Sequence, residues 1–375
     1  MDDRSFAESY DILVIGAGPA GSSAAREAAG MGLRVLLIEK KEHIGIPVQC
    51  AELVSKWVSR YASFDLGSIV QSIETMSIHL PNGKTFEMKS PGYMLDRSLF
   101  DKELATSAIQ SGAEVVTGTR AIEVSAEGVL IQRNNHKEWI RTRVIIGADG
   151  VHSTVARWMK LPSIRMMVAL QCEVVLFKPQ SHADIFFHPD YEGGYGWVFP
   201  KGRTANVGIG VLPLKTSMLP ELLDRFLNLL NRSGELPRIE IVSKTGGSIP
   251  CEPRPQTVFG NILLVGDAAG HAHPITGAGI LNAVIAGERA GRIAAEAIVR
   301  EDLRYLENYE LEWREAFGNA LQYGFHKRVF LDENWKKKDI DFERLVKETW
   351  VGFKEYYEDR KKSGLTPRDT DGIVL

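Results

Sequence analysis

Cysteine is scarce in this chain. Only three of its 375 residues are cysteines, namely Cys50, Cys172 and Cys251. No two of them form a Cys-x-x-Cys pair, so the spacing predicts neither a structural zinc site nor a disulfide framework. Few cysteines without a pairing pattern fit a protein of a reducing compartment.

Long apolar runs are also missing. No apolar stretch approaches the ~18–20 residues that a transmembrane helix needs. The N-terminus carries Asp2, Asp3 and Glu8 before its first apolar run, which is unlike a secretory signal. We therefore expect a cytoplasmic protein. A peripheral contact with the inner face of the membrane stays open, because this test does not detect it.

An excess of positive charge is absent as well. The formal net charge is −3, and 44% hydrophobic with 25% charged residues is the composition of an ordinary soluble protein. We expect no nucleic-acid partner, because neutralising phosphates needs a basic surface. The chain shows no internal repeat and no low-complexity linker. Its length exceeds one compact core and predicts two or three lobes.

What the chain does contain is a βαβ unit near its N-terminus. The β-branched run 11–15 predicts a buried strand. Gly16 to Gly21 follow it as Gly-x-Gly-x-x-Gly, and the Ala-rich segment 22–31 predicts a helix. The run 34–38 predicts a second strand that ends at Glu39, which completes the unit.

The glycine-rich turn is typical of a dinucleotide-binding site. Gly16 permits the tight turn, Gly18 lets a pyrophosphate approach the backbone, and Gly21 allows close packing of helix on sheet. The free N–H groups at the helix start attract phosphate. Glu39 would accept hydrogen bonds from ribose hydroxyls. The alternative is a glycine-rich turn beside a surface glutamate, which the strand–turn–helix context disfavours.

Further patterns predict how the chain is divided. Apolar runs at 144–148 and 262–265 each lead into a Gly/Asp turn and predict strands of the same sheet. Alternating and aromatic patterns lie between these runs and predict a second, mainly antiparallel sheet. We predict an α/β fold with a discontinuous Rossmann-type cofactor domain at 1–75, 93–162 and 251–300. A substrate-binding domain is inserted at 76–92 and 163–250, and a C-terminal helical region with a tail covers 301–375.

Two later motifs separate FAD binding from simple NAD binding. The first is Gly147-Ala-Asp149-Gly150, and the second is Gly266-Asp267-Ala-Ala-Gly270 followed by Pro274 to Ile280. Arg97-Ser-Leu-Phe-Asp101 is a further match. In this order, over about residues 10–300, the chain resembles the flavoprotein superfamily of aromatic hydroxylases and geranylgeranyl reductases.

This resemblance implies FAD as the cofactor. It implies that Asp267 binds the ribitol, that the loop from Pro274 lies along the isoalloxazine ring, and that Arg97 contacts the cofactor. Gly277 and Gly279 would open a helix whose positive end stabilises anionic reduced flavin. An ordinary helix N-cap is the alternative for Asp267. The predicted cofactor-binding residues are Gly16, Gly18, Ala20, Gly21, Glu39, Lys40, Cys50, Ala51, Leu53, Arg97, Ala121, Asp149, Gly150, Asp267, Pro274, Gly277, Gly279 and Ile280.

Two segments resemble the geranylgeranyl reductases in particular. The segment 44–52 ends in Cys-Ala-Glu where that family has Cys-Gly-Glu, and an alanine at position 51 disfavours a positive φ. The segment 195–201 is similar to the Tyr-x-Trp-x-Phe-Pro signature. Strand alternation places its aromatics on one face, which suits a prenyl chain, although ordinary sheet core is the alternative. The resemblance implies substrate-binding roles for Tyr195, Trp197, Phe199 and Pro200.

Cys50 is the candidate catalytic residue. In the resembling family the matching cysteine lies near the reactive part of the flavin. Reducing a C=C bond needs a hydride and a proton, and a thiol is a plausible proton source. The alternative is that Cys50 is a small packing residue.

The two histidines beside the flavin loop predict no metal site. His271 and His273 are spaced i, i+2 and have no evident third ligand, so contacts with cofactor or substrate are favoured for both. The Trp-x-Trp-x-Ile-Pro motif of flavin halogenases is absent.

The resemblance therefore predicts an FAD-dependent reductase that saturates C=C bonds of a geranylgeranyl or polyprenyl group on a lipid, quinone or related isoprenoid, similar to archaeal digeranylgeranylglycerophospholipid reductases. The alternatives are a monooxygenase of the same superfamily and a non-catalytic prenyl-lipid-binding flavoprotein. There is no second Gly-x-Gly-x-x-Gly, so ferredoxin or transiently bound NAD(P)H is the expected electron donor. The cluster Trp335-Lys-Lys-Lys338 is a candidate for contact with an anionic membrane, with a solvated face as the alternative.

Overall fold

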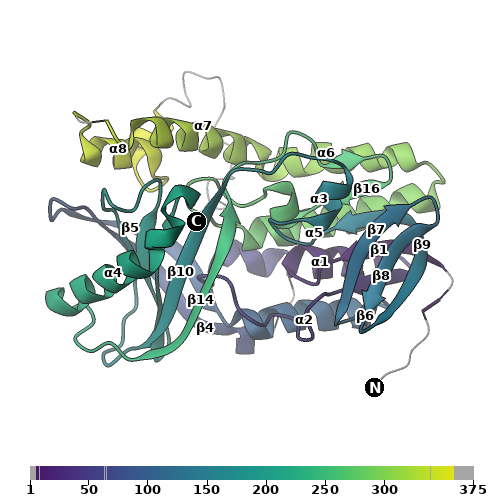
Figure 1. Ribbon diagram of the computed structural model, residues 1–375, viewed down its shortest axis with the longest axis horizontal. Coiled ribbons are helices and arrows are strands. Elements are labelled where there is room, and N and C mark those ends of the chain that lie inside the picture. The colour runs from purple at the N-terminus through teal and green to yellow at the C-terminus, as the bar shows by residue number, and fades with distance from the viewer. Residues whose placement is uncertain (1–5, 8, 63, 65, 338, 359–375) are drawn as a thin grey trace.

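Two eight-stranded sheets organise the chain, and in Figure 1 they lie at opposite ends of the molecule. The computed structural model describes residues 6–358 apart from 8, 63, 65 and 338. Several predicted features lie outside the described residues, namely the acidic start at Asp2, Asp3 and Glu8, Lys338 of the basic cluster, and the tail from Gly364.

The first sheet is the predicted dinucleotide-binding sheet. Its centre is parallel, and the pairing of β1 with both β2 and β9 brings Ile12 beside Val35 and Val144. The four apolar runs expected to be strands are therefore neighbours in it. Its strand order is β15 (Val258–Phe259), β16 (Ile262–Leu264), β9 (His136–Gly147), β1 (Ser9–Ile15), β2 (Val35–Ile38) and β6 (Glu114–Val116), and β7 (Thr119–Ser125) and β8 (Gly128–Arg133) extend β9 as an antiparallel meander.

Three helices share one core with this sheet: α1 (Pro19–Gly30), α2 (Arg97–Gln110) and α5 (Ile280–Val299). The α1 and α5 backbones touch, since a Cβ at Gly287 would lie 2.1 Å from the carbonyl oxygen of Ala20, and one at Gly291 would lie 2.2 Å from that of Ala24. Because the second pair repeats the first one turn later, the two helices run parallel. The short α3 (Thr154–Trp158) packs in a separate core with the meander.

The second sheet is antiparallel except where β11 pairs with β4. It is not confined to 76–92 and 163–250, because β3 lies at residues 53–55, β4 begins at Ile69 and β5 ends at Leu95. Its order is β14 (Ile241–Pro250), β10 (Met166–Val175), β13 (Thr204–Val211), β12 (Tyr195–Lys201), β11 (Ala183–Phe186), β4 (Ile69–His79), β5 (Thr85–Leu95) and β3 (Leu53–Ser55).

Helices cover both faces of the second sheet. On one face α4 (Leu219–Ser233) buries an apolar stripe that includes Phe226. On the other face lie α7 (Asn319–Asn334) and α8 (Phe342–Thr349), which Figure 1 shows along the top of the view. A π-helical turn at 314–318 joins α6 (Asn308–Trp313) to α7.

The architecture confirms the predicted fold class, an α/β fold with a mainly antiparallel second sheet and a C-terminal helical region. Within the described part of the chain, every helix is too short or too polar to span a bilayer.

Candidate active site

The glycine-rich turn connects β1 to α1 at the carboxyl edge of the first sheet. Gly16 has a φ of 103°, and a Cβ there would lie 2.4 Å from the carbonyl oxygen of Ala148, so only glycine fits. A Cβ at Gly18 would meet no described atom within 4 Å. Gly18 is also the N-cap of α1, and no side chain caps this helix. Open space beside free helix N–H groups is a suitable place for a pyrophosphate.

Glu39 stands beside this turn at the end of β2. Its Oε2 accepts a hydrogen bond from the Ala17 N–H at 2.9 Å, and its Oε1 accepts one from the Lys41 N–H at 3.0 Å. The carboxylate is therefore held in one orientation. Each oxygen keeps a second lone pair, which suits the predicted contact with ribose hydroxyls. The neighbouring Lys40 is exposed.

Asp149 uses its side chain within the protein. Its Oδ1 accepts from the Ser153 hydroxyl at 2.6 Å, and its Oδ2 accepts from the backbone N–H groups of Thr154 and Val155 at 2.6 and 3.2 Å. The carboxylate thus holds the start of α3, a role that the sequence did not predict. Gly150 follows with a φ of 82° and open space around its Cβ position, so a ligand has room to reach the backbone here.

Ala121, another predicted contact, lies 5% exposed on β7. Its side chain belongs to the core that α3 and the meander share.

Asp267 follows β16, as predicted, and its carboxylate makes no hydrogen bond to any described residue. Burial raises the pKa of Asp267, while the charge of Arg97 opposes this shift. Its Oδ1 lies 3.5 Å from the position that a Cβ would take at Gly279, the N-cap of α5, which also lacks a side-chain cap. A desolvated carboxylate without a partner among the described residues, next to an uncapped helix start, is suited to bind a hydroxyl-bearing ligand. These residues fit FAD.

The loop before α5 is held from outside the first sheet. The Tyr195 hydroxyl donates to the Thr276 carbonyl at 2.5 Å, and Arg328 Nε donates to the Pro274 carbonyl at 2.9 Å. Inside the loop, His273 Nδ1 accepts from the N–H groups of Ile275 and Thr276. Residues of β12 and α7 therefore set the position of the predicted flavin loop.

The two histidines are fully buried. Burial lowers the pKa of both His271 and His273 to about 3, so both rings are neutral at neutral pH. The His271 ring packs on Trp313, with 4.6 Å between ring centroids, and its nitrogens find no partner among the described residues. No group of three metal-ligating side chains occurs in the described part of the chain.

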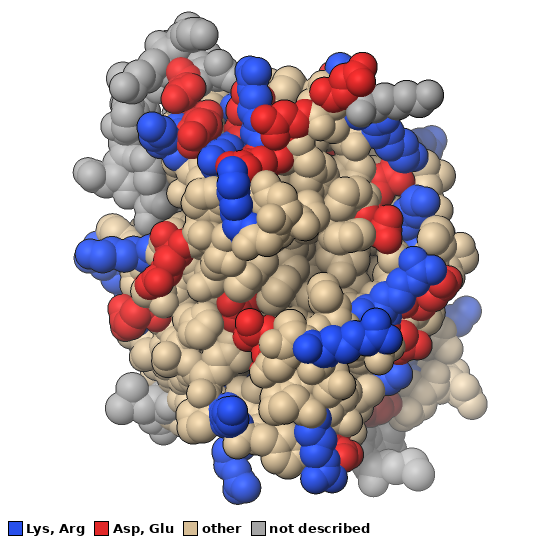
Figure 2. All heavy atoms as spheres, turned by 90° about the vertical axis from the view of Figure 1, so that its left-hand side faces the viewer, with Lys and Arg blue, Asp and Glu red and all other residues tan. Residues whose placement is uncertain are grey.

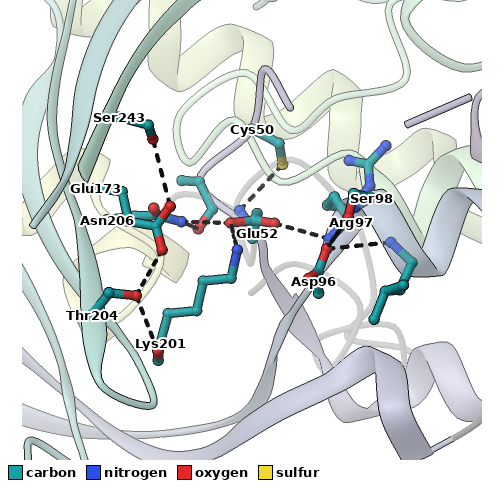
Figure 3. Close-up of polar contacts among 12 residues, drawn as sticks. Cys50, Glu52, Asp96, Arg97, Ser98, Glu173, Lys201, Thr204, Asn206 and Ser243 are labelled. Carbon is teal, nitrogen blue, oxygen red and sulfur yellow. Dashed lines mark hydrogen bonds and ion pairs between the residues drawn. The ribbon is translucent and has the colours of Figure 1, made fainter. Parts of the chain in front are cut away.

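Cys50 lies on the loop between β2 and β3 and faces Arg97, as Figure 3 shows. Its Sγ accepts a hydrogen bond from the Glu52 N–H at 3.3 Å. Burial raises the pKa of the Cys50 thiol above its ordinary value, and Arg97 opposes this. Arg97 also forms a bidentate ion pair with Asp101, with distances of 2.8 and 2.9 Å. The thiol therefore stays protonated at neutral pH, as a proton donor requires.

Glu52 is a residue whose role sequence reasoning missed. It is 2% exposed and has a φ of 69°, so the positive φ of this loop falls on Glu52 and not on Ala51. Its Oε1 accepts from the Arg97 N–H at 2.9 Å, and its Oε2 accepts from Lys201 Nζ at 2.7 Å and Asn206 Nδ2 at 2.9 Å. The available signal was a glutamate flanked by the apolar pairs 50–51 and 53–54.

The aromatic residues of β12 face the core between the second sheet and the C-terminal helices, as the alternation predicts. Tyr195 and Trp197 share this core with Phe199 and with Trp350, and the Tyr195 ring is 5.1 Å from that of Trp350. The indole N–H groups of Trp197 and Trp350 are buried without a partner among the described residues. Trp350 was not predicted, because no local pattern links it to a strand 150 residues earlier.

The remaining predicted contacts are distributed over the same region. Pro200 is buried on β12, and Leu53 and Ala51 follow Cys50 and pack at the border of the aromatic core. Ala20 lies in the first turn of α1, and Ile280 begins α5. The predicted residues thus lie on several separate segments, with the Ala121 side chain in a core and the Asp149 carboxylate bonded to the start of α3.

Comparison with known proteins shows which families this chain resembles. Residues 11–151 match the model of the FAD dependent oxidoreductase family, and residues 172–249 match that of the geranylgeranyl reductase catalytic domain. The digeranylgeranylglycerophospholipid reductase of Methanosarcina acetivorans is 39% identical over 362 residues, covering 88% of this chain and 87% of that protein. A reductase of the same name from Methanopyrus kandleri is 37% identical, covering 86% and 87%.

Solved structures with the same fold include a protein of this kind. A geranylgeranyl bacteriochlorophyll reductase-like protein from Thermoplasma acidophilum superposes with a TM-score of 0.81 at 31% identity, covering 94% of this chain and 99% of that one. A myxobacterial chondrochloren halogenase shares the fold, with a TM-score of 0.71 at 18% identity, covering 98% and 99%. FAD is therefore the cofactor of this oxidoreductase, and the chain belongs to the geranylgeranyl reductase family.

Proposed function

We propose that this protein saturates C=C bonds in the geranylgeranyl chains of a glycerophospholipid. The observation that carries the proposal is the aromatic face of β12. Its Tyr195 hydroxyl bonds the flavin loop at Thr276, and the same strand ends at Lys201, which pairs with Glu52 beside Cys50. One apolar face thus adjoins both the loop expected along the flavin ring and the candidate proton donor.

The protein residues would divide the work as follows. Asp267, Glu39 and the two uncapped helix starts would hold the cofactor. When bound and reduced, FAD supplies the hydride for one alkene carbon. The aromatic face would hold the prenyl chain and exclude water, because Tyr and Trp present large apolar surfaces. The protonated Cys50 thiol would give its proton to the other carbon, and solvent would return it.

The electron donor is proposed to be a small carrier such as ferredoxin, or transiently bound NAD(P)H. The support is the lack of a second glycine-rich dinucleotide motif in the sequence. Stopped-flow reduction of the bound FAD by reduced ferredoxin, NADH and NADPH in turn identifies the donor. The donor that reduces FAD faster than the steady-state turnover is the competent one.

Membrane contact through the basic cluster finds little support. Trp335 is 6% exposed, and its indole N–H donates to the Pro189 carbonyl at 2.8 Å. Lys336 pairs with Glu192 at 2.7 Å, and Lys337 donates to the Asn334 side chain at 2.7 Å. On the end of the molecule formed by the second sheet, Figure 2 shows acidic and basic side chains interspersed over the surface. Neither arrangement is a basic patch that would attract anionic lipid strongly.

The test of the proposed function is an anaerobic assay of the FAD-loaded protein, chemically reduced and given a geranylgeranylated glycerophospholipid. Mass spectrometry is expected to show two hydrogen atoms gained for each bond reduced, together with reoxidation of the flavin. Oxygen-dependent hydroxylation without saturation would show a monooxygenase instead. FAD that no donor reduces would show a non-catalytic binding protein. Either result refutes the proposal.

A further inference from the structure

Glu52 carries a buried charge that the proposed chemistry does not use. A carboxylate can accept about four hydrogen bonds. Among the described residues, Glu52 accepts three, from Arg97, Lys201 and Asn206. We call these four residues the Glu52 cluster, and Figure 3 shows them meeting beside Cys50. A buried ion pair and a positive φ at a residue other than glycine are both unfavourable. They persist only where the surroundings impose them, which points to a functional constraint.

The cluster joins three separate parts of the chain. Lys201 ends β12 and Asn206 lies on β13, and both strands belong to the second sheet. The Arg97 N–H opens α2, which packs with the first sheet. Glu52 itself precedes β3, only two residues after Cys50. One carboxylate therefore connects α2 to the second sheet at the loop that carries the candidate proton donor.

The second sheet also contacts the rest of the loop. Gln171 of β10 donates from Nε2 to the Cys50 carbonyl at 2.9 Å, and Asn206 Nδ2 also approaches the Ala51 carbonyl at 3.2 Å. The Glu52 N–H donates to Cys50 Sγ. The Cys50 carbonyl is therefore held by Gln171, whereas the Cys50 sulfur atom is held by the backbone of Glu52 itself.

We propose that Glu52 is a positioning residue, which holds the Cys50 thiol beside Arg97 by tying its loop to the β12–β13 hairpin. The purpose of this arrangement rests on the proposed function, since a proton donor must stay within reach of the bond that it protonates. The arrangement itself does not depend on the proposed function, so it is tested by a measurement that needs no enzymatic turnover.

The test measures how fast iodoacetamide alkylates each cysteine of the holoenzyme, with peptide mass spectrometry as the readout. Cys172 and Cys251 are 0% and 1% exposed and report global opening in the same molecule. In Glu52→Gln, the alkylation rate of Cys50 is expected to rise at least about tenfold, as for a local opening, while the other two rates stay unchanged. The pH profile of Cys50 alkylation is expected to move to lower pH, because the Glu52 charge disfavours the thiolate.

Two further variants keep the test decisive. Lys201→Met breaks the same ion pair from the other side, and Glu52→Gln with Lys201→Met replaces it by an uncharged pair that leaves no buried charge unpaired. Both are expected to expose Cys50 as Glu52→Gln does. Glu74→Gln is the matched control, because the Glu74 side chain is 67% exposed and pairs with Lys56 on the surface. Its alkylation pattern should equal that of the unmodified chain.

The outcomes separate clearly. If the Cys50 rate is unchanged in all three variants of the cluster, or if the three cysteines gain reactivity together, the positioning role is refuted. Selective exposure of Cys50 supports it, even if the unmodified protein fails to saturate prenyl lipid. In that event the proposed function fails and the positioning role stands. If prenyl lipid is reduced, Glu52→Gln should lower kcat and leave KM nearly unchanged.

Discussion

The indole ring of Trp197 lies on the backbone of Gly208. A Cβ at position 208 would be 2.3 Å from Cζ2 of this ring and 2.6 Å from Cβ of Gln171. The two residues are direct cross-strand partners on β12 and β13, so their side chains share one face of the sheet. The glycine therefore lets the largest residue of the proposed substrate wall lie flat along its neighbouring strand.

Gly208→Ala should move Trp197 out of this position. An inserted methyl group in a packed core costs about 1–3 kcal/mol, and the moved ring would narrow the space for a prenyl chain. We expect KM for the prenyl lipid to rise about tenfold, which is about 1.4 kcal/mol, with FAD affinity unchanged. Steady-state kinetics and a flavin titration measure the two quantities. Gly210→Ala, whose Cβ would meet Met167 at 3.5 Å, is the matched control with a much smaller effect. Equal effects of the two variants would contradict the explanation.

Glu39→Gln should weaken FAD binding. The amide cannot accept hydrogen bonds at both ends, so one of the bonds from Ala17 and Lys41 is lost together with the predicted charge-assisted contact to ribose. Such bonds contribute about 1.5–3 kcal/mol, which corresponds to at least about tenfold in the dissociation constant. Quenching of flavin fluorescence on titration into the apoprotein measures it. Glu42→Gln changes an exposed neighbour and should bind FAD as the unmodified chain does.

Cys50→Ala should lower turnover if the thiol donates the proton. A positioned general acid contributes about 10²–10⁴-fold, so a loss of that size is expected with unchanged flavin affinity. Burial raises the pKa of Cys50, so the donating form persists at neutral pH and is lost as pH rises through that elevated pKa. The rate of prenyl reduction should therefore fall only in alkaline solution. Undiminished turnover of the alanine variant would reduce Cys50 to a packing residue.

His271→Phe should make the protein less sensitive to acid. The pKa of His271 is lowered from 6.5 to about 3 in the folded state by burial, so the unfolded chain binds a proton that the folded one excludes. The corresponding stability is present above the unfolded pKa and is lost as pH falls from 6.5 toward 3, by about 1.4 kcal/mol per pH unit for one group.

Urea unfolding of both proteins at about pH 7 and about pH 5 tests this. The phenylalanine variant should lose less stability between the two pH values. Of the two buried histidines only His273 then remains to take up a proton on unfolding. Its ring fits beside Trp313 and Phe317, and no hydrogen bond of the His271 side chain to a described residue is broken. A loss equal to that of the unmodified chain would show that His271 does not titrate in this way.

Much of the fold and of the candidate site was predicted from patterns within a few consecutive residues. The turn from Gly16 to Gly21, its flanking strand and helix, and the uncapped start of α5 at Gly279 are features of consecutive residues. The alternation along 195–199 likewise predicted one aromatic face, and β12 shows it. Each depends on backbone geometry within a few residues, which is what a sequence pattern encodes.

The sequence by itself determined the cofactor fold, the class of the protein and the list of candidate residues. Only the tertiary structure decided that Asp149 accepts hydrogen bonds at the start of α3, that Trp350 joins the aromatic core, and that Glu52 pairs with Lys201. The physical reason is distance along the chain. Glu52 and Lys201 are 149 residues apart, and a buried charge has no fixed partner until folding brings one within reach.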